Sequence, residues 1–363
     1  MLEDRLVWIN GEFVKWSQAT VHMMSHSFAR GSTIFEVISF YATASGPAVF
    51  RLHDHIARLE KSAGYLDMEL PAGHEAMCRA VADTVRRNRL VQGTIKVVGY
   101  YPQFALDIQP PQKRLDIAVF AIDPARDIKG FEFSFEKGTT AGIARWRKLD
   151  PETVPIEAKA AANYLNGMIA RLDVQKRGLE DAILLDTQGF IAEGATESVF
   201  LVKEGRLLTP SLGTVLDSIT RRSILQVARH LGIETFEGRL PPSLLFEADE
   251  VFFANTPFKV IPVCRIEERR MPAAPGPMQR RLWEALQKIA WGVGIVAATR
   301  VLGWQEAILN LNAICRQCNR ILEKGSRAAI AVVEGNGPRP TLCLTCLKEM
   351  MPHEDTNPAD HNE

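Results

Sequence analysis

The stretch "VPIEAKAAANYLNG", residues 154–167, surrounds a single lysine with small apolar residues. Lys159 has alanine at positions 158, 160, 161 and 162, and Tyr164 follows it five residues later. A lysine in a poorly hydrated setting has its ammonium form disfavoured, so its neutral amine can act as a nucleophile and form a Schiff base. The alternative is a helix N-terminus with one solvated lysine. This stretch alone does not decide between the two.

The composition is that of an ordinary globular protein. The 363 residues suggest two or three domains, and 46% of them are hydrophobic. Lys+Arg and Asp+Glu are equal at 43 each, so we expect no nucleic-acid partner for the core and no anionic membrane partner. The N-terminus lacks an apolar run of signal-peptide length, which predicts a cytoplasmic protein. The longest apolar run, residues 289–299, is shorter than the about 20 residues of a membrane span.

Alternating and helical apolar patterns follow one another along the chain and predict an α/β (α+β) fold with two lobes. We expect an N-terminal small α/β lobe over residues 1–123, an interlobe linker over 124–130 and a large lobe over 131–292. Beyond them we expect a connecting helix or linker over 293–311, a Cys-rich module over 312–350 and a disordered tail over 351–363. Asn10-Gly11 predicts a type I′ hairpin turn. Gly178 is placed to end a helix that starts near Asn163.

Three further features bear on Lys159. Glu193 lies 34 residues later, at the end of an apolar strand in "FIAEG", where a carboxylate can face a cleft and pair with a pyridinium nitrogen. Ser218-Ile219-Thr220 begins a predicted helix, whose free N–H groups suit a phosphate. Arg58 can add a charge-assisted bond to the same phosphate. Each feature also has a plain structural reading: a surface turn, a serine cap and a solvated helix face.

Together these segments resemble the fold-type IV pyridoxal-phosphate aminotransferases, and most closely the branched-chain amino acid aminotransferases, over about residues 5 to 292. The similarity is carried by seven stretches in the family's order: "WINGEFVKW", "VHMMSHSFARGSTIFEVI", "VFRLHDHIARLEKSA", "VPIEAKAAANYLNG", "FIAEGATESVF", "SITRRSI" and "DEVFFANTPFKVIPV". The resemblance implies a pyridoxal 5′-phosphate enzyme whose large lobe binds the cofactor. It also implies transamination between a small L-amino acid, branched-chain or related, and 2-oxoglutarate, in a homodimer or higher oligomer.

The resemblance also implies roles for individual residues. Lys159 corresponds to the lysine that binds the cofactor covalently and moves the proton, and Glu193 to the partner of the pyridine nitrogen. Tyr164 corresponds to the phenol that bonds the cofactor's ring oxygen. The phosphate cup of the family corresponds to Arg58, Ile219, Thr220 and Thr256.

The substrate side departs from the family. Phe35 remains as an apolar wall, but Arg30 replaces an aromatic residue, and Lys96 stands where the family has an arginine. Pro257 lacks the backbone N–H that the family offers to the substrate carboxylate. Arg30 and Lys96 are candidates to bind that carboxylate instead, the alternative being salt-bridged rim residues. Two other functions stay open: a β-eliminating lyase of the aminodeoxychorismate type, and a non-catalytic regulator whose tail carries the binding function.

The C-terminal region contains "CRQC" and "CLTC", with 24 residues between Cys318 and Cys343. Cys315, Cys318, Cys343 and Cys346 predict a structural zinc site of the zinc-ribbon kind, because four thiolates close a tetrahedral shell. Disulfides or free thiols are the alternative, and a cytoplasmic location disfavours disulfides. The tail docks on the enzyme, joins subunits or binds an unknown partner, and the sequence does not choose among these. Cys78 and Cys264 are predicted to be isolated buried thiols.

Overall fold

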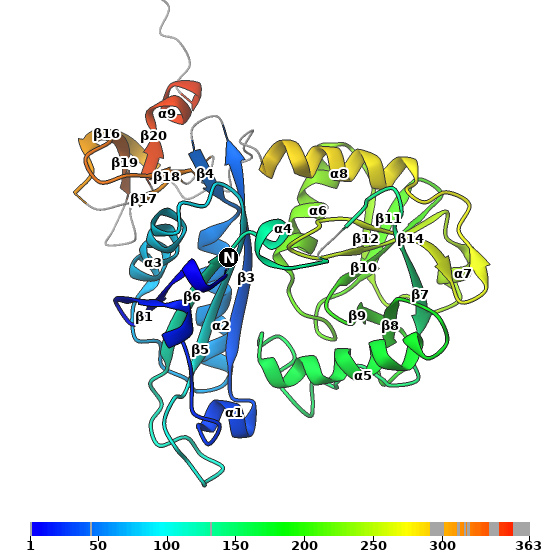
Figure 1. The fold of residues 1–363 in the computed structure, drawn as a ribbon. Coiled ribbons are helices and arrows are strands. Elements are labelled where there is room, and N and C mark those ends of the chain that lie inside the picture. The colour runs from blue at the N-terminus through cyan, green and yellow to red at the C-terminus, as the bar shows by residue number, and fades with distance from the viewer. Residues whose placement is uncertain are drawn as a thin grey trace, which may run out of the picture.

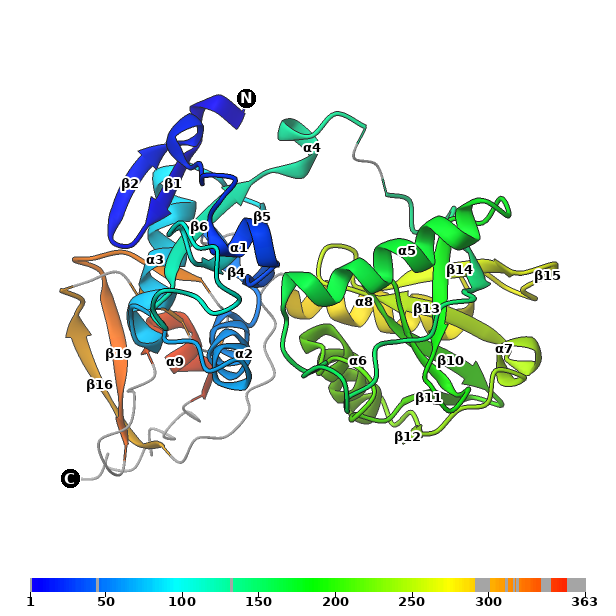
Figure 2. The same cartoon turned by 90° about the horizontal axis from the view of Figure 1, so that it is seen from below.

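The computed structural model describes residues 2–43, 46–130, 133–290, 301–310, 313–315, 317, 320–333 and 341–350. Two sheets form the bodies of two lobes, and a small C-terminal module lies against the N-terminal lobe (Figures 1 and 2). None of the helices within these ranges is long and apolar enough to cross a membrane.

The N-terminal lobe is built on a six-stranded antiparallel sheet of order β2-β1-β6-β5-β3-β4. Its strands are β1 (Leu6–Ile9), β2 (Glu12–Lys15), β3 (Ile34–Thr43), β4 (Gly46–Val49), β5 (Gly93–Tyr100) and β6 (Asp116–Ile122). The predicted hairpin is confirmed, since β1 and β2 are joined through Asn10 and Gly11 with φ of 47° and 107°. Both positive φ values are those of a type I′ turn.

Two helices cover one face of this sheet, α2 (Leu52–Tyr65) and α3 (His74–Arg87). Leu52, Ile56 and Leu59 of α2 and Met77 and Val81 of α3 are fully buried in the same apolar core. The short helix α1 (His26–Arg30) precedes β3.

The large lobe is built on a nine-stranded mixed sheet of order β12-β11-β10-β13-β14-β7-β8-β9, with β15 paired to β14. Its strands are β7 (Thr139–Ile143), β8 (Asp181–Leu185), β9 (Ile191–Gly194), β10 (Ser198–Lys203), β11 (Arg206–Pro210), β12 (Thr235–Gly238), β13 (Glu250–Ala254), β14 (Ile261–Ile266) and β15 (Arg269–Arg270). Strand β7 is parallel to both of its neighbours, and β11 is parallel to β12.

Helices pack on both sides of the large sheet. They are α5 (Tyr164–Gln175), α6 (Ile219–His230), α7 (Leu244–Glu247) and α8 (Pro277–Ala290). Ala170 and Val174 of α5 are buried against β8, while Ile224 of α6 and Leu282 of α8 share a core with Phe252 of β13. Gly178 follows α5 with φ of 76°, as expected for a residue that ends a helix. Figure 1 shows α5 and α8 at opposite sides of the lobe.

The predicted interlobe linker contains one short helix, α4 (Pro124–Asp127). Arg5 forms an ion pair with Asp127 at 2.8 Å, so the chain that leaves the N-terminal lobe is fastened to that lobe's first residues.

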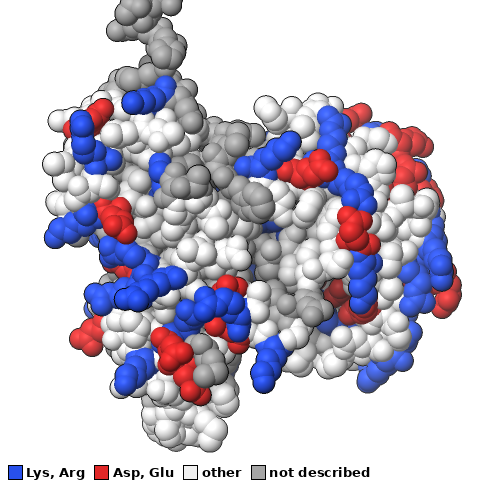
Figure 3. Space-filling view, turned by 45° about the horizontal axis from the view of Figure 1, so that its top comes forward, with Lys and Arg blue, Asp and Glu red and all other residues white. Residues whose placement is uncertain are grey.

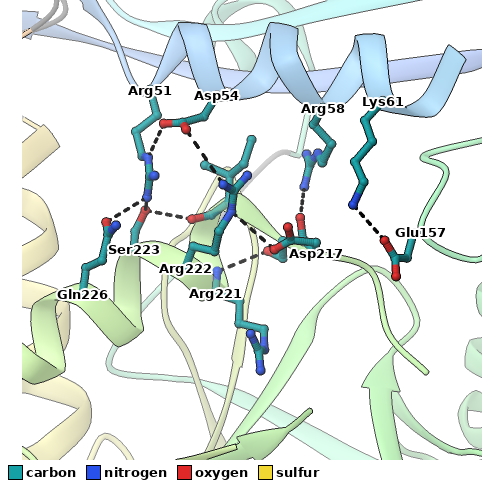
Figure 4. A network of polar contacts seen from close by, with 12 residues as sticks. Arg51, Asp54, Arg58, Lys61, Glu157, Asp217, Arg221, Arg222, Ser223 and Gln226 are labelled. Carbon is teal, nitrogen blue, oxygen red and sulfur yellow. Dashed lines mark hydrogen bonds and ion pairs between the residues drawn. The ribbon is translucent and has the colours of Figure 1, made fainter. Parts of the chain in front are cut away.

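The lobes meet along a polar seam on α2, which Figure 4 shows. Arg51 donates to Ser223 Oγ at 2.9 Å, and Lys61 pairs with Glu157 at 2.9 Å. Arg58 lies between these two contacts and donates to the Asp217 carbonyl at 3.1 Å. One face of α2 is therefore apolar and packs in its own lobe, and another face binds the other lobe.

The C-terminal module corrects one sequence-based expectation. Residues 293–311 are predicted to connect two domains, but β16 (Val301–Ile308) is a strand of the module itself and pairs along its length with β19 (Arg327–Val333). The pairing joins residues that are far apart in sequence, so local patterns do not reveal it. Strand β20 (Thr341–Cys343) completes the three-stranded sheet, and α9 (Leu344–Met350) follows it.

A two-stranded sheet of β17 (Ala313–Ile314) and β18 (Ile321–Leu322) joins the module to the N-terminal lobe. Arg320 forms a β-bridge with Ala48 of β4, and Ile321 packs against the core of that lobe. Cys318 and the predicted disordered tail over 351–363 lie outside the described residues.

Candidate active site

The backbone at Lys159 is held by the opposite lobe. The Lys159 N–H donates to Ser62 Oγ of α2 at 3.0 Å, and the Lys159 carbonyl accepts from the Phe35 N–H at 3.1 Å. The next contact is from the Ala161 N–H to the Thr33 carbonyl at 2.7 Å. A short segment of the large lobe therefore extends the edge of β3, and the lysine lies where the two lobes join.

The side chain of Lys159 is buried, with 9% of the residue exposed. Its Nζ donates to the Tyr164 hydroxyl at 2.5 Å and lies 4.7 Å from the centre of the Phe35 ring. Burial, aided by the positive charge of Arg58, lowers the pKa of Lys159 to about 7. A substantial fraction of neutral amine is then present near neutral pH. The reading of Lys159 as a solvated surface lysine is wrong.

Glu193 is the last residue but one of β9, and it lines the same cavity as Lys159. Its Oε1 lies 2.5 Å from Nζ of Lys148, and its Oε2 accepts from the Leu216 N–H at 3.1 Å. Sequence reasoning missed Lys148, which stands in "RWRKL" without a pattern that marks it. The ion pair and the Leu216 N–H together hold the carboxylate in one orientation at the cavity.

Arg58 is oriented by a second carboxylate that sequence reasoning also missed. Its Nε and Nη2 donate to the two oxygens of Glu36 at 2.7 and 2.8 Å, and its Nη1 donates to the Asp217 carbonyl. Burial raises the pKa of Glu36, but the charge and hydrogen bonds of Arg58 outweigh burial and lower it to about 2. His55 adds a third contact to Glu36 at 2.7 Å. The guanidinium is thus fixed beside the residue that precedes the cap of α6.

The N-terminus of α6 faces the cavity. Ser218 caps the helix by accepting from the Arg221 N–H at 3.2 Å, and Ile219 and Thr220 are its first two residues. First-turn amides have no carbonyl partner within their helix, so they are available to an anion. One cavity is lined by three residues of the expected phosphate site and by the three expected at the reactive amine: Ser218, Thr256 and Arg58, with Lys159, Tyr164 and Glu193.

The predicted substrate residues divide into two groups. Phe35 touches the lysine, and the Lys96 Nζ lies 5.4 Å from the centre of the Phe35 ring. Lys96 also lines an apolar cavity of about 640 Å³ beside the N-terminal sheet. Arg30 is exposed and donates to the Leu106 carbonyl at 2.9 Å, and Pro257 is exposed too. Neither Arg30 nor Pro257 is among the described residues that line the two cavities.

The charged side chains on one outer face of the molecule are mixed in sign. On the face shown in Figure 3, basic and acidic side chains of the described residues are interspersed on both lobes. The charged groups that could bind an anionic cofactor are instead the buried Arg58 and the N-terminus of α6.

The cavity's donor set fits pyridoxal 5′-phosphate. A neutral amine at Lys159 can bond an aldehyde carbon, and a carboxylate at Glu193 can hold a proton on a ring nitrogen. An arginine and a helix N-terminus can bind the phosphate. Fold and site together define a two-lobed pyridoxal-phosphate enzyme.

Comparison with known proteins agrees with this class. The family described as Amino-transferase class IV matches residues 33–266. The branched-chain-amino-acid aminotransferase of Escherichia coli (strain K12) is 34% identical over 281 residues, which are 77% of this chain and 91% of that protein. The Pseudomonas aeruginosa (strain PAO1) enzyme of the same name is 29% identical over 283 residues, which are 78% of this chain and 92% of that protein.

Solved structures give the same result. A T.th. branched-chain amino acid aminotransferase with pyridoxamine 5′-phosphate has a TM-score of 0.75 and 32% identity, covering 80% of this chain and 95% of that one. The Escherichia coli enzyme has a TM-score of 0.74 and 31% identity, covering 78% and 94%.

The chain belongs to the class IV aminotransferases. It is a pyridoxal-phosphate enzyme with the two-lobed fold-type IV architecture that the sequence predicts. The lyase and the non-catalytic regulator are not favoured, because the relatives compared are aminotransferases.

Proposed function

We propose that this enzyme transfers the amino group of a small L-amino acid, branched-chain or related, to 2-oxoglutarate. Glutamate is the product of this transfer and the amino donor of the reverse reaction. The observation that carries the proposal is the buried Lys159 amine, which shares one cavity with Tyr164, Glu193 and Arg58. The T.th. relative has been solved in complex with N-(5′-phosphopyridoxyl)-L-glutamate, which supports glutamate as one exchange partner. When bound, the cofactor supplies an electron sink for breaking bonds at the substrate's α-carbon.

The residues of the cavity have distinct proposed tasks. Lys159 binds the cofactor covalently and, once released, moves a proton through Nζ. Tyr164 orients that amine through its 2.5 Å contact and bonds the cofactor's ring oxygen. Glu193, oriented by Lys148, holds the proton on the pyridine nitrogen. The phosphate is bound by Arg58, Thr256 and the N–H groups of Ile219 and Thr220.

The substrate side chain is proposed to lie along Phe35, with Lys96 near enough to attract a carboxylate. Arg30 reaches the substrate only by exchanging its bond to the Leu106 carbonyl. Pro257 has no backbone N–H to donate, so a carboxylate bound there lacks one charge-assisted hydrogen bond, which is worth roughly 1.5–3 kcal/mol. We therefore expect a donor preference that differs from leucine, isoleucine and valine, or a raised KM for these three.

Half-transamination tests the proposal directly. Adding an amino acid alone to the loaded enzyme is expected to shift the cofactor's visible absorbance from the aldehyde form to the amine form, and 2-oxoglutarate is expected to reverse the shift. A panel of donors, repeated with Arg30→Ala and Lys96→Ala, assigns the carboxylate partner. Release of pyruvate without any keto acid would instead identify a lyase, and no spectral change with any donor would contradict transamination.

A structural zinc ion is proposed in the C-terminal module. Cys315, Cys343 and Cys346 are buried, and their sulfur atoms lie within 4.8 Å of one another. The Cys343 N–H points at Cys315 Sγ at 3.3 Å, and the Cys346 N–H at Cys343 Sγ at 3.4 Å. Such bonds stabilise thiolates, and Cys318 is the proposed fourth ligand. Elemental analysis of Cys343→Ser should show one zinc fewer per chain than the unaltered protein.

A homodimer or higher oligomer is proposed from exposed apolar side chains around α1 and the loop between β5 and β6. Met23, Phe28, Phe104, Leu106 and Ile108 are 60–73% exposed. Figure 1 shows α1 and this loop together at the lower end of the N-terminal lobe. Light scattering should give at least twice the chain mass, and Leu106→Asp should lower it. The cytoplasmic location stays a prediction, which cell fractionation can test.

A further inference from the structure

A cluster of metal-binding side chains lies outside the active site and outside the C-terminal module. It is formed by His53 in the first turn of α2 and by His74 and Cys78 in the first turns of α3. The His53 Nδ1 lies 3.1 Å from the His74 Nε2 and 3.7 Å from the Cys78 Sγ. All three ligand atoms lie within 4.8 Å of one another.

These distances are those of one coordination shell. In a tetrahedral zinc site with bonds of about 2.0–2.1 Å to nitrogen and about 2.3 Å to sulfur, two nitrogens lie about 3.3 Å apart, and a nitrogen lies about 3.6 Å from a sulfur. The sequence spacing agrees, because His74 and Cys78 are four residues apart and so lie on one face of α3. His53 comes from the neighbouring helix, so the shell joins two elements.

A carboxylate contacts one of the two imidazoles. Glu60 lies seven residues after His53, two turns further along the same face of α2, and its Oε2 is 3.1 Å from the His74 Nδ1. When a carboxylate accepts a hydrogen bond from one imidazole N–H, the other ring nitrogen carries no proton and becomes more basic. This is the arrangement of carboxylate–histidine–zinc sites. The His74 Nε2 is therefore the nitrogen whose lone pair is available to a cation, and it is also the nitrogen that faces His53.

The charges around the thiol favour a divalent cation. The negative charges of Glu75 and Glu60 act on the Cys78 thiol, and the positive charge of Arg79 opposes them. The same carboxylates stabilise positive charge at this point. Binding would release the thiol proton to solvent and move the His53 proton from Nδ1 to Nε2, giving two neutral imidazoles and one thiolate as ligands.

We infer that His53, His74 and Cys78 form a binding site for a zinc-class divalent metal, which fastens the start of α2 to the start of α3. The ligand set of two imidazoles and one thiolate is the borderline-soft set that zinc and cobalt(II) accept. His74 is 26% exposed at its side chain, so water can complete the shell. The site lies close to the enzyme's own cavity along the chain, because Arg58, in the middle of α2, lines the cofactor cavity.

Metal content per chain tests the inference in the full-length, cofactor-loaded enzyme. After equilibration with zinc and gel filtration, His74→Ala and Cys78→Ser are each expected to carry one zinc fewer than the unaltered protein. His230→Ala and Cys264→Ser are matched controls, since His230 is exposed on α6 and Cys264 bonds the Thr139 carbonyl. Equal zinc in all four variants would overturn the inference.

A spectroscopic experiment covers the case in which those variants fail to fold. A chain with Cys315→Ser and Cys343→Ser lacks two thiolates of the C-terminal module but keeps the three ligands between α2 and α3. Cobalt(II) is expected to give tetrahedral visible bands and the charge-transfer intensity of a single thiolate, both abolished by excess zinc. If no tetrahedral cobalt spectrum develops in this chain, the site does not exist.

Discussion

At the scale of single residues, the chemistry depends on neighbours that change what each side chain does. Lys159 is an ordinary amine whose proton affinity is lowered by burial and by Arg58. Glu193 is an ordinary carboxylate kept in place by Lys148 and the Leu216 N–H. Both effects arise from the position of the side chain at the junction of the lobes.

The first residue-scale prediction concerns the pH at which Lys159 reacts. A lysine with a pKa of about 7 is neutral for roughly a tenth of molecules at pH 6 and nine tenths at pH 8, whereas an ordinary lysine near 10.4 stays protonated throughout. The rate at which cofactor-free protein takes up pyridoxal phosphate should therefore rise with a midpoint near pH 7. Borohydride reduction should then label the 154–167 peptide. A label on another lysine would contradict the role of Lys159.

The carboxylate of Glu193 is tested by replacing it with an amide. Glu193→Gln should keep the cofactor but lower the transamination rate by about 10²-fold or more, because a neutral amide does not hold the pyridine proton against the developing charge. Glu157→Gln changes a carboxylate on the lobe seam and serves as the control. Unchanged turnover in Glu193→Gln would show that Glu193 has only a structural role in the turn after β9.

At the scale of elements, the site depends on how closely helices and strands approach. Helix α5 follows the cofactor lysine and passes the turn between β9 and β10 at Gly167, where an added Cβ would lie 2.1 Å from the Ala195 carbonyl oxygen. That contact sets the distance between the start of α5, with Tyr164, and the end of β9, with Glu193. Only glycine permits it.

Gly167→Ala should therefore destabilise the protein by about 1–3 kcal/mol and weaken cofactor retention, since the backbone must move to relieve the overlap. Gly64→Ala is the matched control in α2, because its added Cβ meets nothing within 4 Å. That variant should be neutral or more stable by up to about 1 kcal/mol. Urea unfolding followed by fluorescence measures both. Equal stabilities of the two variants would show that α5 adjusts freely.

At the scale of the whole molecule, the C-terminal module is attached to the N-terminal lobe and stands away from the cofactor cavity. Its described contacts include the Ala48–Arg320 bridge and the packing of Ile321 on the lobe's core, on the side where α3 lies. The cavity is lined from both lobes without any described residue of the module.

A chain truncated after residue 290 should therefore keep the cofactor's visible absorbance and lose the zinc bound by the module's cysteines. Its unfolding temperature should fall, because the surface that Ile321 covers becomes exposed. Absorbance, elemental analysis and calorimetry on the same sample measure the three outcomes. Failure of the truncated chain to bind pyridoxal phosphate would show that the module is part of the enzyme's core.

The amino-acid sequence predicts the fold type, the order of most strands and helices, and the cofactor chemistry at Lys159. It could do so because hydrophobic periodicity and turn residues act over a few neighbouring positions, and because the family's motifs are local stretches.

The partners that come from distant parts of the chain are visible only in the folded structure. Glu36 on Arg58, Lys148 on Glu193, and strand β16 beside β19 are all such contacts. The same holds for His53 beside His74 and Cys78, which only the packing of α2 on α3 brings within reach of one ion. Hydrogen bonds and charges act over a few ångströms in space whatever the separation in sequence, so these contacts leave no local pattern to read.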